Sequence, residues 1–182
     1  MFIWREPRIF LFVNLFLFST ISLSQDFSAE QAKAEMQPKF RAEAWVQIWE
    51  DYVKTEFLGL KSIELNEDVG RAWSKVKFSH PWPLLTKDGF IDIYAGYNFN
   101  EYDCKNNLIA NRIIIPVGRN DDYQTPVVSN SPKIEPVASG SDKERLLVAV
   151  CKYGKTGMFP DIDAEIISRN GRKAFENFTK QN

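Results

Sequence analysis

The chain has 182 residues, of which 44% are hydrophobic and 14% are aromatic, enough for one domain with a sizeable core. Its formal net charge is −1, so no basic excess draws it to nucleic acid or to anionic lipid. The single histidine, His80, excludes a metal site built from several histidines. The sequence has no glycine-rich phosphate loop and no Gly-x-Ser-x-Gly nucleophile motif. We therefore expect no enzyme, no bound metal and no cofactor.

The N-terminal segment has the pattern of a secretory signal peptide. Arg5 and Arg8 precede an apolar run over residues 9–23, and small residues occupy the −3 and −1 positions of a cleavage site before Gln25. We assign residues 1–24 to this signal peptide. The alternative is an uncleaved membrane anchor, although the run is shorter than the ~20 apolar residues that a span normally needs.

Residues 25–43 are polar and rich in alanine, and we interpret them as a helical or flexible spacer outside the core, with any helix ending at Pro38. The folded domain is expected over residues 44–154. Beyond it, residues 155–182 form a polar, amphipathic tail, in which we expect one or two helical turns interrupted at Asn170-Gly171.

Alternating apolar residues and β-branched or aromatic content predict six strands within the folded domain. These strands cover residues 44–51, 53–65, 71–78, 89–104, 108–117 and 123–129. Short turns join several of them, which indicates an antiparallel sheet. We place His80-Pro81-Trp82-Pro83 in a loop, because two prolines remove two backbone donors.

One helix follows the strands. Ser141-Asp142-Lys143-Glu144 has the form of a capping box, apolar residues then recur at helical spacing, and Gly154 suits a C-terminal cap. The helix should begin after Ser141 and end near Tyr153. The resulting fold class is α+β, with a small antiparallel sheet of about five to six strands and one helix packed on it.

Cys104 ends the longest predicted strand, and Cys151 lies on the apolar side of the predicted helix. They are the only two cysteines in the chain, and an exported protein favours pairing them. We expect a disulfide that ties helix to sheet. The alternative is a pair of unpaired buried thiols.

Two groups of side chains are candidates for contact with a partner. Trp82, in the proline-rich segment, suits an exposed contact, because tryptophan is enriched in interfaces. Basic side chains on neighbouring strands could form a modest basic face; they are Lys54, Lys61, Arg71, Lys75 and Lys77. The alternative is that these lysines and this arginine are the ordinary solvent-facing residues of a sheet.

Carboxylates are the remaining chemistry to consider. Asp92, Glu101 and Asp103 lie on or near one strand, and the run from Asp161 to Glu165 has acids at alternate positions. We interpret both groups as solvated, since the second lacks the glycine and the length of a calcium loop. A carboxylate-based hydrolase stays open as an alternative, because such pairs meet only in three dimensions.

A series of short motifs occurs in a definite order over residues 44–154. They are Trp45, Leu60-Lys61-Ser62-Ile63, Arg71-Ala72-Trp73-Ser74-Lys75, Asp103-Cys104, Tyr123 with Val127-Val128-Ser129, and Val148-Ala149-Val150-Cys151. This order resembles the surface-adhesin protein E family of Gram-negative bacteria. The resemblance implies a curved sheet with a disulfide-tied helix on its concave face, and a location in the envelope. It also implies binding of host proteins such as laminin, vitronectin and plasminogen.

These observations lead to one principal expectation. The chain should be an exported, non-enzymatic binding module of the periplasm or outer-membrane surface of a Gram-negative bacterium, with a host matrix or serum protein or an envelope component as partner. It should have no transmembrane span after signal cleavage, and it could pair as a homodimer through an edge strand. The alternative is a periplasmic structural or stress-related protein without a host ligand.

Overall fold

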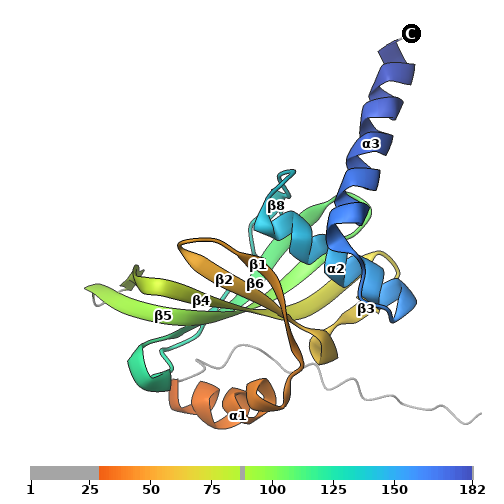
Figure 1. The fold of residues 1–182 in the computed structure, drawn as a ribbon. Helices are drawn as coiled ribbons and strands as arrows, with labels where there is room; N and C mark the ends of the chain where they lie inside the picture. The colour runs from red at the N-terminus through yellow and green to blue at the C-terminus, as the bar shows by residue number, and fades with distance from the viewer. Residues whose placement is uncertain (1–28, 87–88, 182) are drawn as a thin grey trace, which may run out of the picture.

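The computed structural model describes residues 29–86 and 89–181 (Figure 1). The predicted signal peptide, residues 1–24, lies outside the described residues. The elements in chain order are α1 (Ala29–Ala42), β1 (Trp45–Glu50), β2 (Lys54–Gly59), η1 (Leu60–Ser62), β3 (Glu64–Asn66), β4 (Val69–Thr86), β5 (Gly89–Asp103), β6 (Leu108–Val117), η2 (Arg119–Asp121), β7 (Val127–Val128), β8 (Ile134–Pro136), α2 (Asp142–Thr156) and α3 (Ile162–Gln181).

The strands of the described residues form one sheet whose pairings are all antiparallel, so the α+β class is confirmed. Its main order is β1-β2-β4-β5-β6-β7, with β3 on β4 and β8 on β6. With eight strands over the described part of the chain, the sheet is larger than the five to six that we predicted. One extra strand arises because the predicted strand over residues 53–65 is divided by η1 into β2 and β3. The other is β8, which has three residues and is too short to show an alternating pattern.

The prediction of a loop at His80-Pro81-Trp82-Pro83 is wrong. β4 continues through this segment for 18 residues in all and pairs with β5 as far as Thr86. The prolines are tolerated because β2 pairs with β4 only as far as Phe78, which leaves the outer edge of β4 open beyond that point. The pairing with β5 is also irregular between Lys77 and Trp82, so this stretch needs fewer backbone donors.

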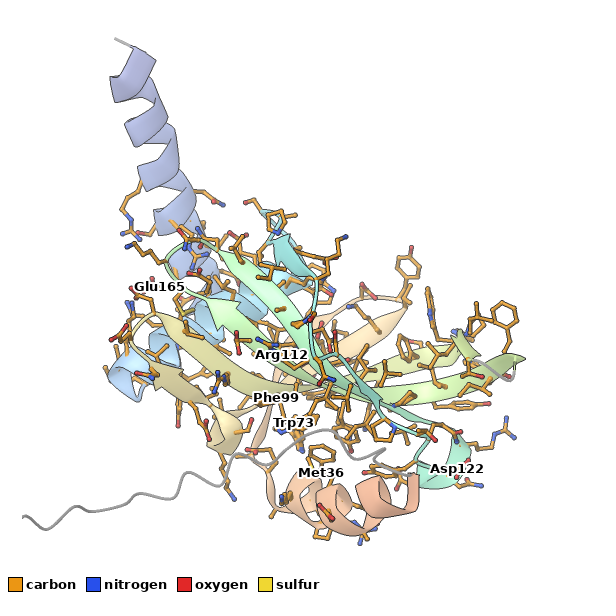
Figure 2. The ribbon with its side chains drawn as sticks, turned by 180° about the vertical axis from the view of Figure 1, so that it is seen from behind. Met36, Trp73, Phe99, Arg112, Asp122 and Glu165 are labelled. Carbon is orange, nitrogen blue, oxygen red and sulfur yellow. A yellow bond between two sulfur atoms is a disulfide. The ribbon has the colours of Figure 1, made fainter. Side chains whose placement is uncertain are left out.

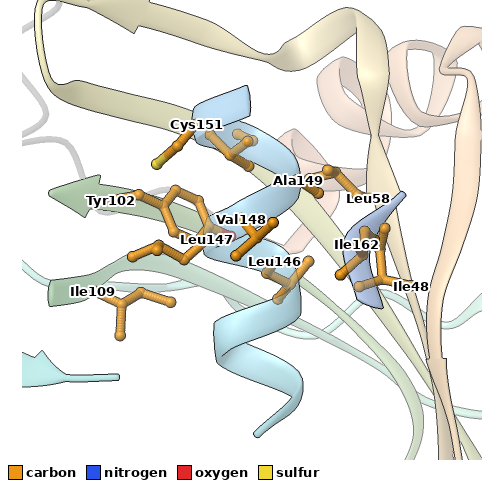
Figure 3. Packing of buried hydrophobic residues seen from close by; sticks show 12 residues of the cluster. Ile48, Leu58, Tyr102, Ile109, Leu146, Leu147, Val148, Ala149, Cys151 and Ile162 are labelled. Atoms are coloured by element: carbon orange, nitrogen blue, oxygen red, sulfur yellow. The ribbon is translucent and has the colours of Figure 1, made fainter. Parts of the chain in front are cut away.

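One face of the sheet is covered by α2, and we call it the α2 face. Leu147 of the helix is fully buried against Leu58 and Tyr102 of the sheet (Figure 3), and Val150 is fully buried in the same cluster. The predicted helix start is confirmed, because the Ser141 hydroxyl accepts a hydrogen bond from the backbone N–H of Glu144 at 3.2 Å. The Glu144 carboxylate accepts a hydrogen bond from the backbone N–H of Gly140 at 2.7 Å. In a standard capping box the donor is the N–H of the N-cap residue, which here is Ser141, the next residue along the chain.

The predicted disulfide between Cys104 and Cys151 is present, with a Cα–Cα distance of 5.7 Å. It ties the second half of α2 to the residue that follows β5. The predicted helix end near Tyr153 is wrong, because the helix continues to Thr156 and Gly157 forms the left-handed cap. Gly154 has a different role, since a Cβ atom there would lie 2.7 Å from the Cβ of Leu65.

The opposite face is covered by α1. Phe40 is buried there, with its ring stacked on Tyr97 at 3.9 Å between centroids and edge-on to Trp73 at 5.0 Å. Figure 2 shows Met36 of the same helix beside Trp73. The interpretation of residues 25–43 as a spacer outside the core is therefore wrong for the part that forms α1. Pro38 lies inside this helix and does not end it.

The tail after α2 forms the single helix α3, so the predicted interruption at Asn170-Gly171 is wrong. Its first turns are anchored, because Ile162 is buried in the α2-face core and Arg169 donates to the Asn107 side chain at 3.0 Å. From there the helix extends away from the sheet (Figure 1). None of the helices in the described part of the chain is long and apolar enough to cross a bilayer.

Candidate functional site

A cleft of about 300 Å³ opens on the α2 face of the sheet, beside the N-terminal end of α2. The cleft occurs because α2 covers only part of this face. One part of its lining is apolar or aromatic and includes Val76, Phe78, Trp82, Ile93, Pro116 and Leu146. The other part is polar and consists of Lys54, Glu56, Asn98, Asn100, Asn111, Asp142 and Lys143.

The charged part of the cleft is a cluster of Lys54, Glu56 and Asp142. The Lys54 ammonium lies 3.3 Å from a Glu56 carboxylate oxygen and also pairs with Asp142. Glu56 is only 7% exposed, on a strand flanked by β1 and β4. β2 therefore contributes the lysine and the glutamate, and the first turn of α2 contributes the aspartate.

Burial raises the pKa of Glu56 to about 7; the charge of Lys54 partly opposes this effect, and the Asp142 carboxylate adds to it. Burial alone would lower the pKa of Lys54, but Glu56 and Asp142 outweigh it and raise that pKa. Burial acts to raise the pKa of Asp142, yet its hydrogen bond from Lys54 leaves that pKa lowered. The cluster thus holds an ammonium, a carboxylate and a carboxyl group that exchanges its proton near neutral pH.

Three asparagines line the part of the cleft formed by β5 and β6. Asn111 donates to the Asn98 side-chain oxygen at 3.5 Å, which leaves one donor group of Asn98 and the oxygen of Asn111 unengaged among the described residues. Asn100 is buried and donates to the Ser74 hydroxyl and to the Tyr102 hydroxyl, each at 3.3 Å. Amide side chains therefore face the cleft with both donors and acceptors.

Beyond the cleft, the end of the β4–β5 hairpin projects as an arm. We define the β4–β5 arm as residues 82–86 and 89–93, which pair with each other while β2 pairing stops at Phe78 and β6 pairing begins at Ala95. Phe90 is 75% exposed, Leu85 is 69% exposed and Trp82 is 49% exposed. A groove of about 610 Å³ runs between the arm and residues 124–127. Such a concentration of exposed apolar side chains is typical of an interaction surface.

Two of the six predicted contact residues lie at this end of the molecule. Trp82 belongs to the arm and lines the cleft, and Lys54 lies in the cleft. The Lys75 ammonium lies over the ring of Tyr97, and the Lys77 ammonium lies over the ring of Phe57. These lysines alternate along β4 with Val76 and Phe78, which line the cleft, so both lysines lie on the opposite face of the strand.

The other two basic residues have separate partners. Arg71 pairs with Glu101 at 3.1 Å, and the Lys61 ammonium bonds the backbone oxygen of Ala42. Trp82 and Lys54 thus line the cleft, whereas Arg71, Lys75 and Lys77 occupy β4 positions on the other face of the strand.

The acidic residues considered from the sequence do not converge on the cleft. Glu101 pairs with Arg71 and Arg112, Asp103 accepts hydrogen bonds within the turn after β5, and Asp92 is exposed. Sequence reasoning missed Glu56 and Asp142, which meet across the sheet and helix. Each had an ordinary local explanation, Glu56 as one polar residue of a strand and Asp142 as a first-turn acid of a helix.

No protein-family model matches the chain, and no curated protein matches it. The chain is similar to a solved crystal structure, protein E from non-typeable Haemophilus influenzae, with a TM-score of 0.46 at 6% sequence identity. That similarity covers 69% of this chain and 88% of the other chain.

Proposed function

We propose that the chain is an exported, non-enzymatic binding module of the bacterial envelope and that its β4–β5 arm contacts a protein partner. The exposure of Phe90 and Leu85 at the end of this arm is the observation that supports the proposal most directly. Exposed apolar side chains on a folded chain cost solubility, and a partner that covers them recovers about 1.5–3 kcal/mol for each large side chain.

The open edges of the arm indicate how a partner would bind. The strands of the arm pair with each other, and within the described residues their outer edges have no strand beside them. Pro81 and Pro83 weaken the β4 edge as a template for another strand, whereas the β5 edge over residues 89–93 keeps its backbone donors. An extended segment of a partner can therefore pair with β5 and place apolar side chains in the groove beside Leu84 and Ile91.

The test is a pull-down with the exported protein as bait. Envelope extract is one source of partners, and immobilised laminin, vitronectin and plasminogen are the others, chosen because of the resemblance to the surface-adhesin protein E family. We expect Leu85→Ser with Phe90→Ser to weaken capture at least about tenfold, because two apolar contacts are lost. Equal capture by this variant and by the unmodified protein would refute the role of the arm.

Tyr52→Ser is the matched control, since Tyr52 is 89% exposed in the turn between β1 and β2, outside the arm. Capture from envelope extract alone, with a chain that survives protease treatment of intact cells, would favour the alternative of a periplasmic structural protein without a host ligand. Capture of a host protein, together with protease sensitivity on intact cells, would favour an adhesin.

A carboxylate-based hydrolase is the second candidate, favoured by Glu56 and Asp142 in one cleft. A carboxyl group with a pKa of about 7 beside an ionised carboxylate suits general acid–base chemistry. Among the described residues that line the cleft there is no serine, threonine, cysteine or histidine, so Glu56 and Asp142 would have to supply both the acid and the base or nucleophile. Release of soluble fragments from envelope polymers, abolished by Glu56→Gln, would support the hydrolase; absence of release supports the binding module.

A further inference from the structure

The cleft beside α2 differs in character from the β4–β5 arm. The arm is exposed and apolar, whereas the cleft combines an aromatic wall with a polar wall of amides and a charged cluster. Ligand sites typically have this composition, a mainly apolar lining with a few placed polar groups, and they start at about 300 Å³. The cleft therefore has the size for a small molecule or for the end of a polymer.

The aromatic wall offers a flat surface. The rings of Phe78 and Trp82 stack nearly parallel, 17° apart with centroids separated by 5.7 Å, and Trp82 is half exposed. A face of this kind binds flat apolar surfaces, and tryptophan in particular combines a large ring with a polar N–H. The C–H face of a pyranose ring is such a surface, because its hydroxyl groups project from the rim and leave one side of the ring apolar.

The amide wall suits the rim of the same ring. Each sugar hydroxyl both donates and accepts a hydrogen bond, and a primary amide also has both capacities. Asn98 and Asn111 supply one free donor group and one free acceptor among the described residues. The Glu56 carboxyl lines the cleft with them; it is engaged with Lys54 and Asp142, and its remaining oxygen lone pairs add an acceptor.

The charge of the cleft argues against a strongly ionic ligand. Lys54 is already paired with Glu56 and Asp142, and Lys143 at the cleft pairs with Glu135 at 3.0 Å. A phosphate or sulfate group would have to displace a carboxylate, and an amine would have to displace Lys54. A neutral, polyhydroxylated ligand needs neither exchange.

We propose that this cleft binds a neutral saccharide, with one pyranose ring stacked on Trp82 and its hydroxyl groups hydrogen-bonded to Asn98, Asn111 and Glu56. This site uses the polar wall and Trp82 at the base of the arm, and not Leu85 and Phe90 at its end, so it goes beyond the protein partner proposed above. It gives the module a second ligand class, the glycans of an envelope or of a cell surface.

Calorimetric titration of the exported protein with cellotriose, maltotriose and N,N′,N″-triacetylchitotriose tests the proposal. We expect at least one of them to bind with a dissociation constant of about 1 mM or tighter. Asn98→Ala with Asn111→Ala should weaken that binding about thirtyfold, because two hydrogen bonds of about 1 kcal/mol each are lost. Trp82→Leu, which keeps an apolar side chain but removes the ring face, should weaken it about tenfold.

Asn130→Ala is the control, because Asn130 is exposed and lies outside the cleft. Far-UV circular dichroism checks that each variant is folded. The proposal would be overturned if none of the three saccharides binds at about 10 mM, a concentration that detects even weak binding. It would also be overturned if the double asparagine variant binds a saccharide as tightly as the unmodified protein does. Retention of saccharide binding by Leu85→Ser with Phe90→Ser, together with loss of protein capture, would separate the cleft from the arm.

Discussion

Glu56 provides the sharpest test of the cleft, because its buried carboxyl group links proton binding to stability. Its pKa is raised from an ordinary 4.5 to about 7 in the folded chain, chiefly by burial. Each tenfold change in proton affinity corresponds to about 1.4 kcal/mol, so ionising Glu56 costs the folded state about 3 kcal/mol. We predict that replacing it by glutamine removes this cost.

The sign follows from which state holds the proton more tightly. The folded state does, so the contribution of Glu56 is fully present below pH 4.5 and is lost as the pH rises through about 7. The unmodified protein should therefore lose about 3 kcal/mol of unfolding free energy across this window, relative to Glu56→Gln. Above pH 7 the variant should be the more stable protein.

Guanidinium chloride unfolding measures the difference in unfolding free energy between the unmodified protein and Glu56→Gln. The measurements are made in steps of about one pH unit from about 4.5 to about 8.5, which spans the range in which Glu56 titrates. Glu64→Gln is the matched control, since Glu64 lies exposed on β3, outside the cleft. Parallel stability profiles for the unmodified protein and Glu56→Gln would refute the assignment of a buried, proton-exchanging carboxyl group to the cleft.

Two further predictions concern the two faces of the sheet. Replacing Cys104 and Cys151 together by serine should lower the unfolding free energy by about 4 kcal/mol, which is the loop-closure value for their separation of 47 residues. The comparison is with the unmodified protein in the absence of reductant, and an unchanged unfolding free energy would contradict a disulfide in the native state. Phe40→Ala should cost about 3–5 kcal/mol, because Phe40 is buried against Tyr97 and Trp73. Thermal or denaturant melts compare it with Lys39→Ala, exposed on the same helix, and equal stability of the two would show that α1 does not belong to the core.

Local patterns predicted much of the sheet because they are set by backbone geometry. The strand over residues 108–117 has the predicted bounds, since alternation and a flanking turn define it without help from the rest of the chain. The bounds of β4 were missed, because the penalty for a proline depends on whether the neighbouring edge is paired. That information is tertiary, and residues 80–83 alone do not carry it.

The same limit applies to the covering helices. The start of α2 was predicted from Ser141 and Glu144, whose contact spans three residues. The contribution of α1 was missed, because one buried side chain, Phe40, joins a polar segment to Tyr97, more than fifty positions along the chain. The cleft was missed for this reason too: Glu56 and Asp142 meet only when β2 and α2 have packed.

The two ends of α2 are held by different chemistry, and this difference has a consequence for the cleft. The disulfide of Cys151 fixes the second half of the helix, far from the cleft. The first half is held by the pairing of Asp142 with Lys54 and by a hydrogen bond from Arg145 to the backbone oxygen of Ile48 at 3.0 Å. Reducing the disulfide therefore releases the second half of α2 from the sheet, away from the cleft. A change of pH around 7 instead changes the charge of Glu56, which lies in the cleft. Any ligand held by Glu56 should bind with a pH dependence that the disulfide does not alter.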